Sequence, residues 1–207
     1  MHAKVDLSPV YNRTASIEFQ DDNNTFGAGA MNNMTRYPIG IVHIAGTDFD
    51  VRGYAQLGLL DRGGSGMVQR LECIPLPNLA AAAIHLLMHN GDEYRVPAGE
   101  KLAELTLHYD DGVQSEPIPL RAGLELQGSD DDSLAPFAFA TEHVLVRLGG
   151  PTRILTAPRL ENPRPEHPIA CMDLQWLSRA GSTLELPCAP AWICWPSPLP
   201  DGRRRSR

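Results

Sequence analysis

Apolar and polar residues alternate in short blocks along most of the chain, and turn-forming residues close these blocks. Leu105, Leu107 and Tyr109 alternate with Thr106 and His108, and an Asp-Gly pair then supplies a hairpin turn. The same pattern predicts further strands within residues 5–19, 39–45, 49–57, 83–89, 113–120, 144–148, 169–176, 182–186 and 191–195. Since strands are usually about 5–6 residues long, we expect an all-β fold of about eight to ten strands.

The run of four alanines at positions 80–83 favours a helix on local propensity alone. Apolar residues alternate with His85 and His89 directly after this run. We therefore interpret the alanines as the approach to a strand, because side chains on a strand repeat every two residues.

The composition fits one large β domain. The chain has 207 residues, of which 43% are hydrophobic, and this is enough for a sizeable core. We predict a single domain over residues 1–196 and a flexible basic tail over residues 197–207. The formal net charge of −7 argues against a general nucleic-acid binder, which needs a basic face to displace counterions.

The first residues lack the apolar stretch and cleavage site of a signal peptide. No apolar run approaches the ~18 residues that a membrane helix needs, so we expect no membrane insertion. As the chain is written, it is expected in the cytoplasm. The alternative is that it is a domain of a larger exported protein.

Four cysteines occur, Cys73, Cys171, Cys188 and Cys194, and none forms a Cys-x-x-Cys pair. This spacing argues against a zinc ribbon and a thioredoxin-like site. Buried free thiols are one interpretation. A bridge between Cys188 and Cys194 in an oxidising compartment is the other.

Several blocks occur in an order and at spacings typical of one known family. They are Val5-Asp6-Leu7-Ser8-Pro9, Pro38-Ile39-Gly40, Phe49-Asp50-Val51-Arg52-Gly53 with Gln56-Leu57, Ile74-Pro75-Leu76, residues 85–89, residues 107–112, Ile118-Pro119-Leu120, residues 161–165 and residues 169–176. Together they resemble the galactose-binding-domain-like β-sandwich modules of bacterial envelope and regulatory proteins. The resemblance spans residues 5–195 and implies a jelly-roll sandwich that binds glycans or other cell-surface matter without catalysis.

Two tryptophans that such modules often carry are absent from residues 90–94 and 122–126. Sugars commonly pack on flat aromatic faces, so this departure predicts weak binding. The hydrogen bonds to a carbohydrate are then expected from polar residues of one sheet face and its surroundings. These candidate residues are Arg52, His85, His89, His108, Arg147 and Asn162.

The same residues can also have purely structural roles. The three histidines fit side chains satisfied within or beside the core, and Arg52 fits an ion pair with Asp50. A catalytic zinc site on the histidines, and hence a metal-dependent hydrolase, is a further alternative. The acidic runs at 21–24 and 130–132 offer oxygen ligands for a structural calcium, although solvated turns are the default interpretation of both.

Motifs for covalent catalysis or phosphate binding are absent: the sequence has no Gly-x-Ser-x-Gly elbow and no phosphate-binding Gly-x-x-x-x-Gly-Lys. We therefore expect a non-enzymatic binding module without a cofactor, and carbohydrate is the leading ligand class. Paired carboxylates for glycoside hydrolysis remain open, because their separation is a three-dimensional property. The alternative function is a protein-interaction or structural module, for which Trp192 and Trp195 are candidate docking residues.

Overall fold

The computed structural model describes residues 2–14, 40–44, 46–58, 68–90, 96–127, 138–141, 153–177, 184–187 and 192–194. Within these segments the chain forms β-strands and one 3-10 turn, Ser8–Val10, and it contains no α-helix. All strand pairs in the sheets are antiparallel. The prediction of an all-β fold is confirmed.

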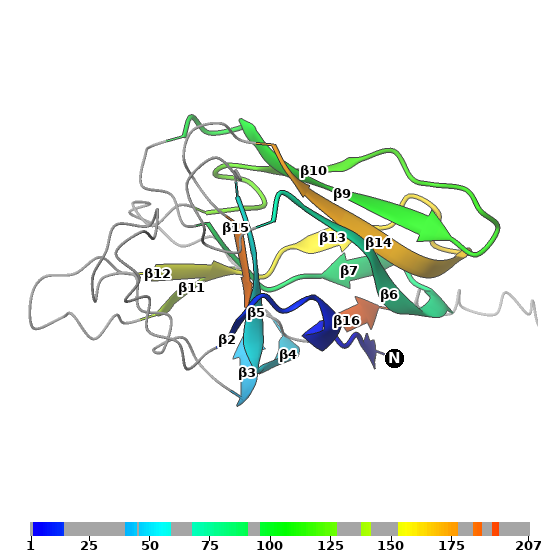
Figure 1. Cartoon of the computed structure of the whole chain (residues 1–207), viewed down its shortest axis with the longest axis horizontal. Helices are drawn as coiled ribbons and strands as arrows, with labels where there is room; N and C mark the ends of the chain where they lie inside the picture. The colour runs from blue at the N-terminus through cyan, green and yellow to red at the C-terminus, as the bar shows by residue number, and fades with distance from the viewer. Residues whose placement is uncertain are drawn as a thin grey trace, which may run out of the picture.

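Four strands form one layer, which lies along the upper side of the molecule in Figure 1. Their order is β10 (Ile118–Arg121), β9 (Lys101–Tyr109), β14 (Pro168–Trp176) and β6 (Arg70–Ala80). The turn predicted after Tyr109 joins β9 to the segment that leads to β10. The N–H of Gly112 donates to the Tyr109 carbonyl at 3.0 Å, and Gly112 has a φ of +80°, which glycine adopts without steric cost.

The opposite layer consists of two sheets that continue each other. One has the order β1 (His2–Lys4), β16 (Trp192–Cys194), β7 (Ala83–His85) and β13 (Arg159–Glu161). The other has the order β11 (Ala138–Thr141), β12 (Arg153–Thr156), β8 (Met88–Asn90), β15 (Leu184–Pro187), β5 (Gly53–Leu57) and β2 (Arg13–Thr14). Because β7 and β8 are successive parts of one segment, and β12 and β13 of another, these segments cross from one sheet into the other.

A single apolar cluster joins the two layers. From the four-stranded layer it includes Leu105, Leu107 and Trp176, and from the opposite layer Ile84 and Met88. All five are at most 1% exposed, as expected for side chains in the interior of two packed sheets. One face of β9 packs on this cluster, and this explains why Leu105 and Leu107 alternate with polar residues in the sequence.

The hairpin of β3 (Gly40–Ile44) and β4 (Thr47–Val51) covers a second, smaller apolar cluster. Phe49 and Val51 of this hairpin pack there with Leu87 and Leu155. Leu86 belongs to the main cluster and the adjacent Leu87 to the second one, so this segment is buried on both faces. Ala80 ends β6 and Ala83 begins β7, so the interpretation of the alanine run as the approach to a strand is confirmed. The strand expected over residues 83–89 is divided at Leu86 and Leu87 into β7 and β8.

The structure divides several predicted strands. The predicted strand 49–57 breaks at Arg52, where the chain leaves the β3–β4 hairpin and joins β2 and β15 through β5. Such breaks bring the strands of the described segments to sixteen, more than the predicted eight to ten. The predicted strand 144–148 lies outside the described residues. No helix in the described part of the chain has the length and apolar character to cross a membrane.

Candidate functional site

Polar side chains gather on the outward face of the four-stranded layer. The partners across β9 and β14 are Glu104 with Gln175, Thr106 with Asp173, and His108 with Cys171. These positions alternate with core residues, so their side chains point away from the cluster between the layers. Together with three residues of β6, Arg70, Glu72 and Cys73, we call this surface the polar face.

Asp173 lies at the centre of the polar face, and its side chain is only 9% exposed. Its Oδ1 accepts a hydrogen bond from the Cys73 N–H at 2.7 Å, and its Oδ2 accepts one from Arg70 Nη2 at 2.6 Å. Nε2 of His108 lies 3.1 Å from the same Oδ2. Burial alone would raise the pKa of Asp173, but these three contacts outweigh it and hold the pKa below its ordinary value. The carboxylate is therefore ionised and fixed in position.

A bulge between β6 and β14 makes this arrangement possible. The register of the two strands shifts between Met172 and Leu174, next to Asp173. On the other strand Cys73 has a φ of +47°, which a non-glycine residue rarely adopts. Bulges re-aim side chains and backbone groups. In this case the N–H of Cys73 donates to the side-chain carboxylate of Asp173 on the neighbouring strand β14.

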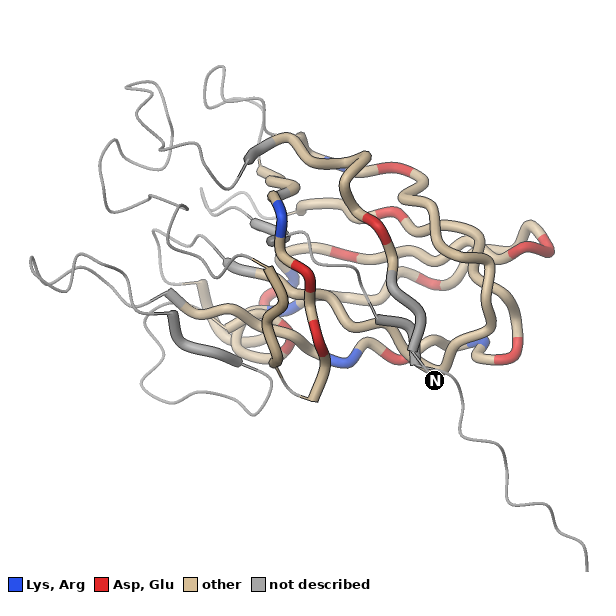
Figure 2. Tube along the Cα trace, turned by 90° about the horizontal axis from the view of Figure 1, so that it is seen from below, with Lys and Arg blue, Asp and Glu red and all other residues tan. Residues whose placement is uncertain are grey.

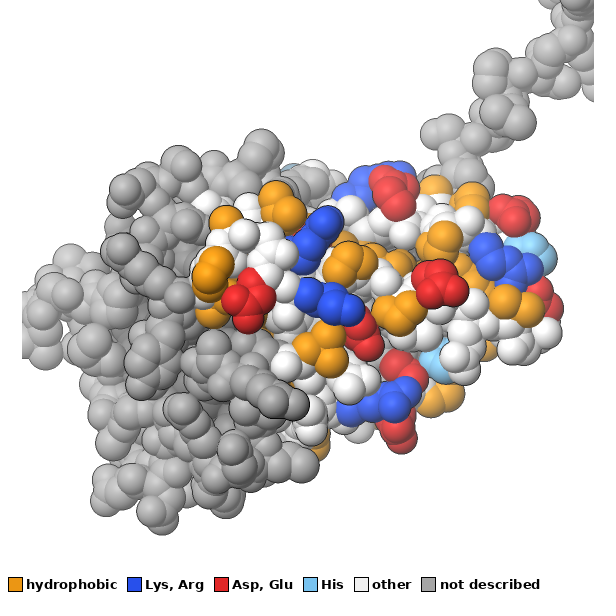
Figure 3. Space-filling view, turned by 90° about the horizontal axis from the view of Figure 1, so that it is seen from above, with side chains coloured by type: hydrophobic (Ala, Val, Ile, Leu, Met, Phe, Trp, Pro, Cys, Tyr) orange, Lys and Arg blue, Asp and Glu red, His pale blue; other side chains and the backbone are white. Residues whose placement is uncertain are grey.

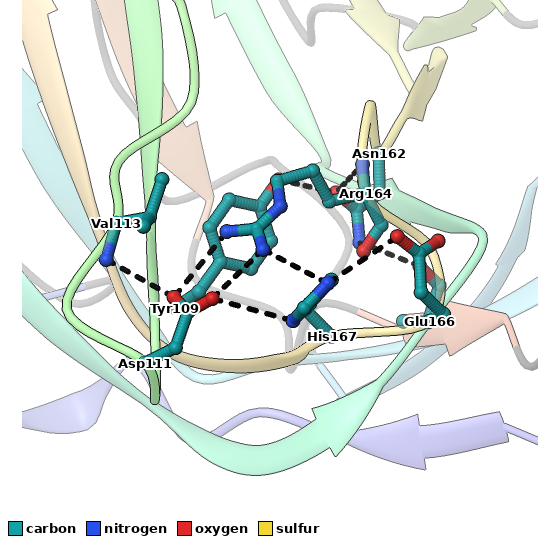
Figure 4. Close-up of polar contacts among 8 residues, drawn as sticks. Tyr109, Asp111, Val113, Asn162, Arg164, Glu166 and His167 are labelled. Atoms are coloured by element: carbon teal, nitrogen blue, oxygen red, sulfur yellow. Dashed lines mark hydrogen bonds and ion pairs between the residues drawn. The ribbon is translucent and has the colours of Figure 1, made fainter.

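A second polar cluster lies where β9 ends and the β13–β14 loop passes beside it (Figure 4). The side-chain amide of Asn162 makes four internal hydrogen bonds in this cluster. Its nitrogen donates to the carbonyls of Ala81 and Arg164 at 2.7 and 3.1 Å, and its oxygen accepts from the Tyr109 hydroxyl and the Arg164 N–H at 2.6 and 3.0 Å. These four bonds fill the donor and acceptor capacity of an amide. Asn162 thus holds the loop in place.

Arg164 connects this loop to the hairpin turn. Its guanidinium lies over the ring of Tyr109 at 4.7 Å from the centroid, and its Nη2 donates to Asp111 at 2.7 Å. This hydrogen bond is the main reason why the pKa of Asp111 falls to about 2. Asp110, Asp111 and His167 have ligand atoms within 4.8 Å of one another. A cation bound there would compete with Arg164 for the Asp111 carboxylate, so the cluster is already neutralised by the protein.

The predicted site residues do not gather in one place. His108 lies on the polar face, whereas His85 is a buried residue of β7 in the opposite layer. His89 belongs to β8, in a different sheet from His85, so the three predicted histidines lie on three different sheets. This arrangement argues against a zinc site on the three of them. Among the described residues, the only group of three or more possible ligands is the one at the hairpin turn.

Arg52 is exposed between β4 and β5, and its Nη2 donates to Asp50 at 2.5 Å, which confirms the predicted ion pair. Several other candidates lie outside the described residues or side chains. They are Arg147, Cys188, Trp195, the side chains of His89, Trp192 and Cys194, and the acidic runs at 21–24 and 130–132.

Arg70, Cys73 and Asp173 were not predicted from the sequence. The sequence pattern could have indicated Asp173, since it is the charged residue between Met172 and Leu174 in a strand whose other face is apolar. No such pattern indicated the contact of Cys73 with Cys171. Their Sγ atoms lie 2.6 Å apart although 98 positions separate the two residues, and Cys73 is exposed rather than a buried thiol.

Acidic and basic side chains are interspersed with apolar ones where Figure 3 looks down on the β9 and β10 side of the molecule. Basic positions are also scattered along the described trace, among acidic ones, rather than gathered on one element (Figure 2). Compared with protein-family models, curated proteins and solved structures, the chain matches none. Its function has to be inferred from its own side chains.

Four carboxyl groups of the described residues have a pKa below the ordinary value. A general acid needs a raised pKa. The pKa is lowered for Asp6, Asp111, Glu125 and Asp173, so these four groups lack that property. Burial and the Cys73 contact raise the pKa of the Cys171 thiol to about 12, so this thiol is protonated in the reduced chain.

Proposed function

We propose that the protein is a non-catalytic binding module and that its polar face binds a carbohydrate. The observation that carries this proposal is the fixed group formed by Arg70, Asp173 and His108 on the outward side of a rigid sheet. Each of these side chains carries hydrogen-bonding atoms, and a contact with the neighbouring strand fixes its position.

Sugar hydroxyl groups both donate and accept hydrogen bonds, so they need donors and acceptors side by side. The polar face offers both. Arg70 is a donor, Asp173 and Glu104 are acceptors, and Thr106 and Gln175 supply both kinds of group. Vicinal hydroxyls suit the paired atoms of carboxylate, guanidinium and amide groups in particular.

Partial burial adds to the suitability of the face. The side chain of His108 is 23% exposed and that of Arg70 is 47% exposed, while Asp173 lies beneath them. A ligand therefore meets groups that are already ordered, and this lowers the entropic cost of binding. Affinity nevertheless stays weak, in the micromolar to millimolar range, because the described residues of the face include no Trp, Tyr or Phe ring for a sugar to stack on.

The antiparallel layers with a shared core are compatible with the jelly-roll sandwich that the family resemblance implies. We propose this finer fold as well. In such a fold, the outward face of a sheet is a natural ligand surface because its backbone is held by neighbours on both sides.

A thermal-shift screen against a panel of mono- and oligosaccharides tests this function. A ligand that binds the native state raises the melting temperature as its concentration rises. The polar-face variants His108→Ala and Arg70→Ala are expected to abolish the shift. The matched controls are His43→Ala, which alters an exposed histidine of β3, and Arg159→Ala on β13 in the opposite layer; both should retain it. No shift with any sugar, or a shift that all four variants retain, contradicts the proposal.

A further inference from the structure

The thiols of Cys73 and Cys171 meet across two neighbouring strands without forming a bond. Both are free cysteines, and their Sγ atoms lie 2.6 Å apart. A disulfide needs its two sulfurs in direct contact, at about 2.05 Å, and these thiols already face each other across neighbouring strands. We propose that Cys73 and Cys171 are a redox site that hydrogen peroxide converts reversibly into a disulfide.

The bulge places the two thiols together. Cys171 is opposite Pro75 in the register of β14 with β6, and the register shifts beyond Met172. Cys73 then takes a left-handed backbone conformation, with a φ of +47°. A non-glycine residue persists in that conformation only when its surroundings impose it. The Asp173 carboxylate contributes to this constraint by accepting the Cys73 N–H at 2.7 Å.

The two thiols differ in their exposure to solvent, so they have different roles in the oxidation. Cys73 is exposed and Cys171 is buried. Burial, followed by the contact with Cys73, raises the pKa of Cys171 to about 12, so this thiol stays protonated until Cys73 has reacted. Cys73 is therefore the residue that meets the oxidant, and Cys171 is the resolving residue.

The charges around Cys73 favour a small neutral oxidant. Glu72 precedes it in the chain, and Asp173 contacts its N–H. Arg70 pairs with both carboxylates and offsets one of their two charges. The negative charge that remains repels anionic oxidants such as glutathione disulfide, whereas hydrogen peroxide is uncharged. A metal is the less suitable occupant, because no third ligand among the described side chains completes a group with these two sulfurs.

The reaction proceeds in two balanced steps. The Cys73 thiolate attacks one oxygen of the peroxide, the O–O bond breaks, and a sulfenic acid forms together with hydroxide, which takes up the proton lost by the thiol to give water. The Cys171 thiol then attacks the sulfur of the sulfenic acid. An S–S bond forms, the S–O bond breaks, and the hydroxyl leaves with the Cys171 proton as a second water. Two thiols lose two electrons, and the peroxide gains them.

Peptide mapping of the native full-length chain after peroxide treatment tests this proposal. We expect a peptide pair joined through Cys73 and Cys171, lighter by two hydrogen atoms than the reduced pair, which dithiothreitol separates again. Cys171→Ser should leave Cys73 to oxidise further to sulfinic acid, because the resolving thiol is gone. Cys188→Ser/Cys194→Ser serves as the control, in which the same pair should still form.

The melting temperature of the oxidised chain provides a second measurement. A disulfide compatible with the native strands lowers the conformational entropy of the unfolded chain. It should therefore raise the melting temperature by about 10 °C. The proposal is overturned if Cys73 reaches sulfinic acid while Cys171 remains open to alkylation in the unmutated chain. A fall in the melting temperature on oxidation also overturns it, since the bond would then require a distorted fold.

Discussion

The hydroxyl of Tyr109 donates a 2.6 Å hydrogen bond to the side-chain oxygen of Asn162, 53 positions further along the chain. Both residues are buried, and the bond joins the end of β9 to the loop between β13 and β14. It therefore connects strands of the two layers at the edge of the main core.

The first prediction concerns this connection. Asn162→Ala leaves the Ala81 carbonyl and the Tyr109 hydroxyl without their partner, and we expect it to lower the free energy of unfolding by about 2–4 kcal/mol. Tyr109→Phe should cost about 1 kcal/mol. Urea denaturation of both single variants and the double variant should give a coupling energy of about 1 kcal/mol. Val113→Ala, at a residue 47% exposed, is the control and should change stability by less than about 0.5 kcal/mol. Full additivity of the two changes would show that the bond does not contribute.

A second prediction concerns the centre of the polar face. Asp173→Asn keeps the shape of the side chain but removes the charge that holds Arg70 and the Cys73 N–H. We expect a loss of about 1–3 kcal/mol in the free energy of unfolding, because hydrogen bonds to charged groups contribute more than neutral ones.

The matched control for this change is Glu72→Gln. Glu72 also contacts Arg70, at 3.4 Å, but its side chain is 70% exposed. Exposed ion pairs contribute little, so its stability should match that of the unmutated chain. Equal losses in the two variants would show that the burial of Asp173 has no energetic consequence.

The third prediction concerns acid stability. The pKa of Asp111 is about 2 in the folded chain, against an ordinary value of 3.8, so the folded state favours the ionised form. Its stabilising contribution is present above the ordinary value and is lost as the pH falls from 3.8 towards 2. Asp111→Asn removes this group, so stability measured by denaturation should decline less steeply in that range than in the unmutated chain.

Asp110→Asn serves as the comparison for acid stability, since it removes a neighbouring charge but leaves the Arg164–Asp111 pair intact. Its decline between pH 3.8 and 2 should remain as steep as that of the unmutated chain. If Asp111→Asn shows the same slope as Asp110→Asn, the pairing with Arg164 does not stabilise the fold.

A fourth prediction tests the hairpin turn. Gly112 has a φ of +80°, so Gly112→Ala should cost about 1–2 kcal/mol through strain in the left-handed region. Nothing lies within 4 Å of a Cβ at this position, so crowding does not contribute. Gly112→Asn should cost less, because asparagine tolerates this conformation. An alanine variant as stable as the asparagine variant would refute the strain explanation.

The sequence predicted the strands well where one face is apolar and the other polar. In β9, Leu105 and Leu107 face the core while Thr106 and His108 face outward, and the period of two was visible directly. The segment around Leu86 and Leu87 was harder, because it is buried on both sides and its alternation is incomplete. The break at Arg52 was not predicted, since it depends on which strands pair on either side of it.

The site was less predictable than the fold. His85 and His89 are four positions apart, which on one continuous strand places them on one face. The two-residue break between β7 and β8 instead assigns them to different sheets. Asp173 and Cys73 come together through a bulge, and a bulge depends on the register between strands that are about a hundred positions apart.

An NMR titration of the isotope-labelled chain tests most directly whether the polar face binds a carbohydrate. The ligand is the sugar that gives the largest thermal shift. We expect fast-exchange shifts at Thr106, His108, Asp173 and Gln175, with little change in the β3–β4 hairpin, and a millimolar or sub-millimolar dissociation constant. Saturable shifts confined to another surface, or none at all, would contradict the account.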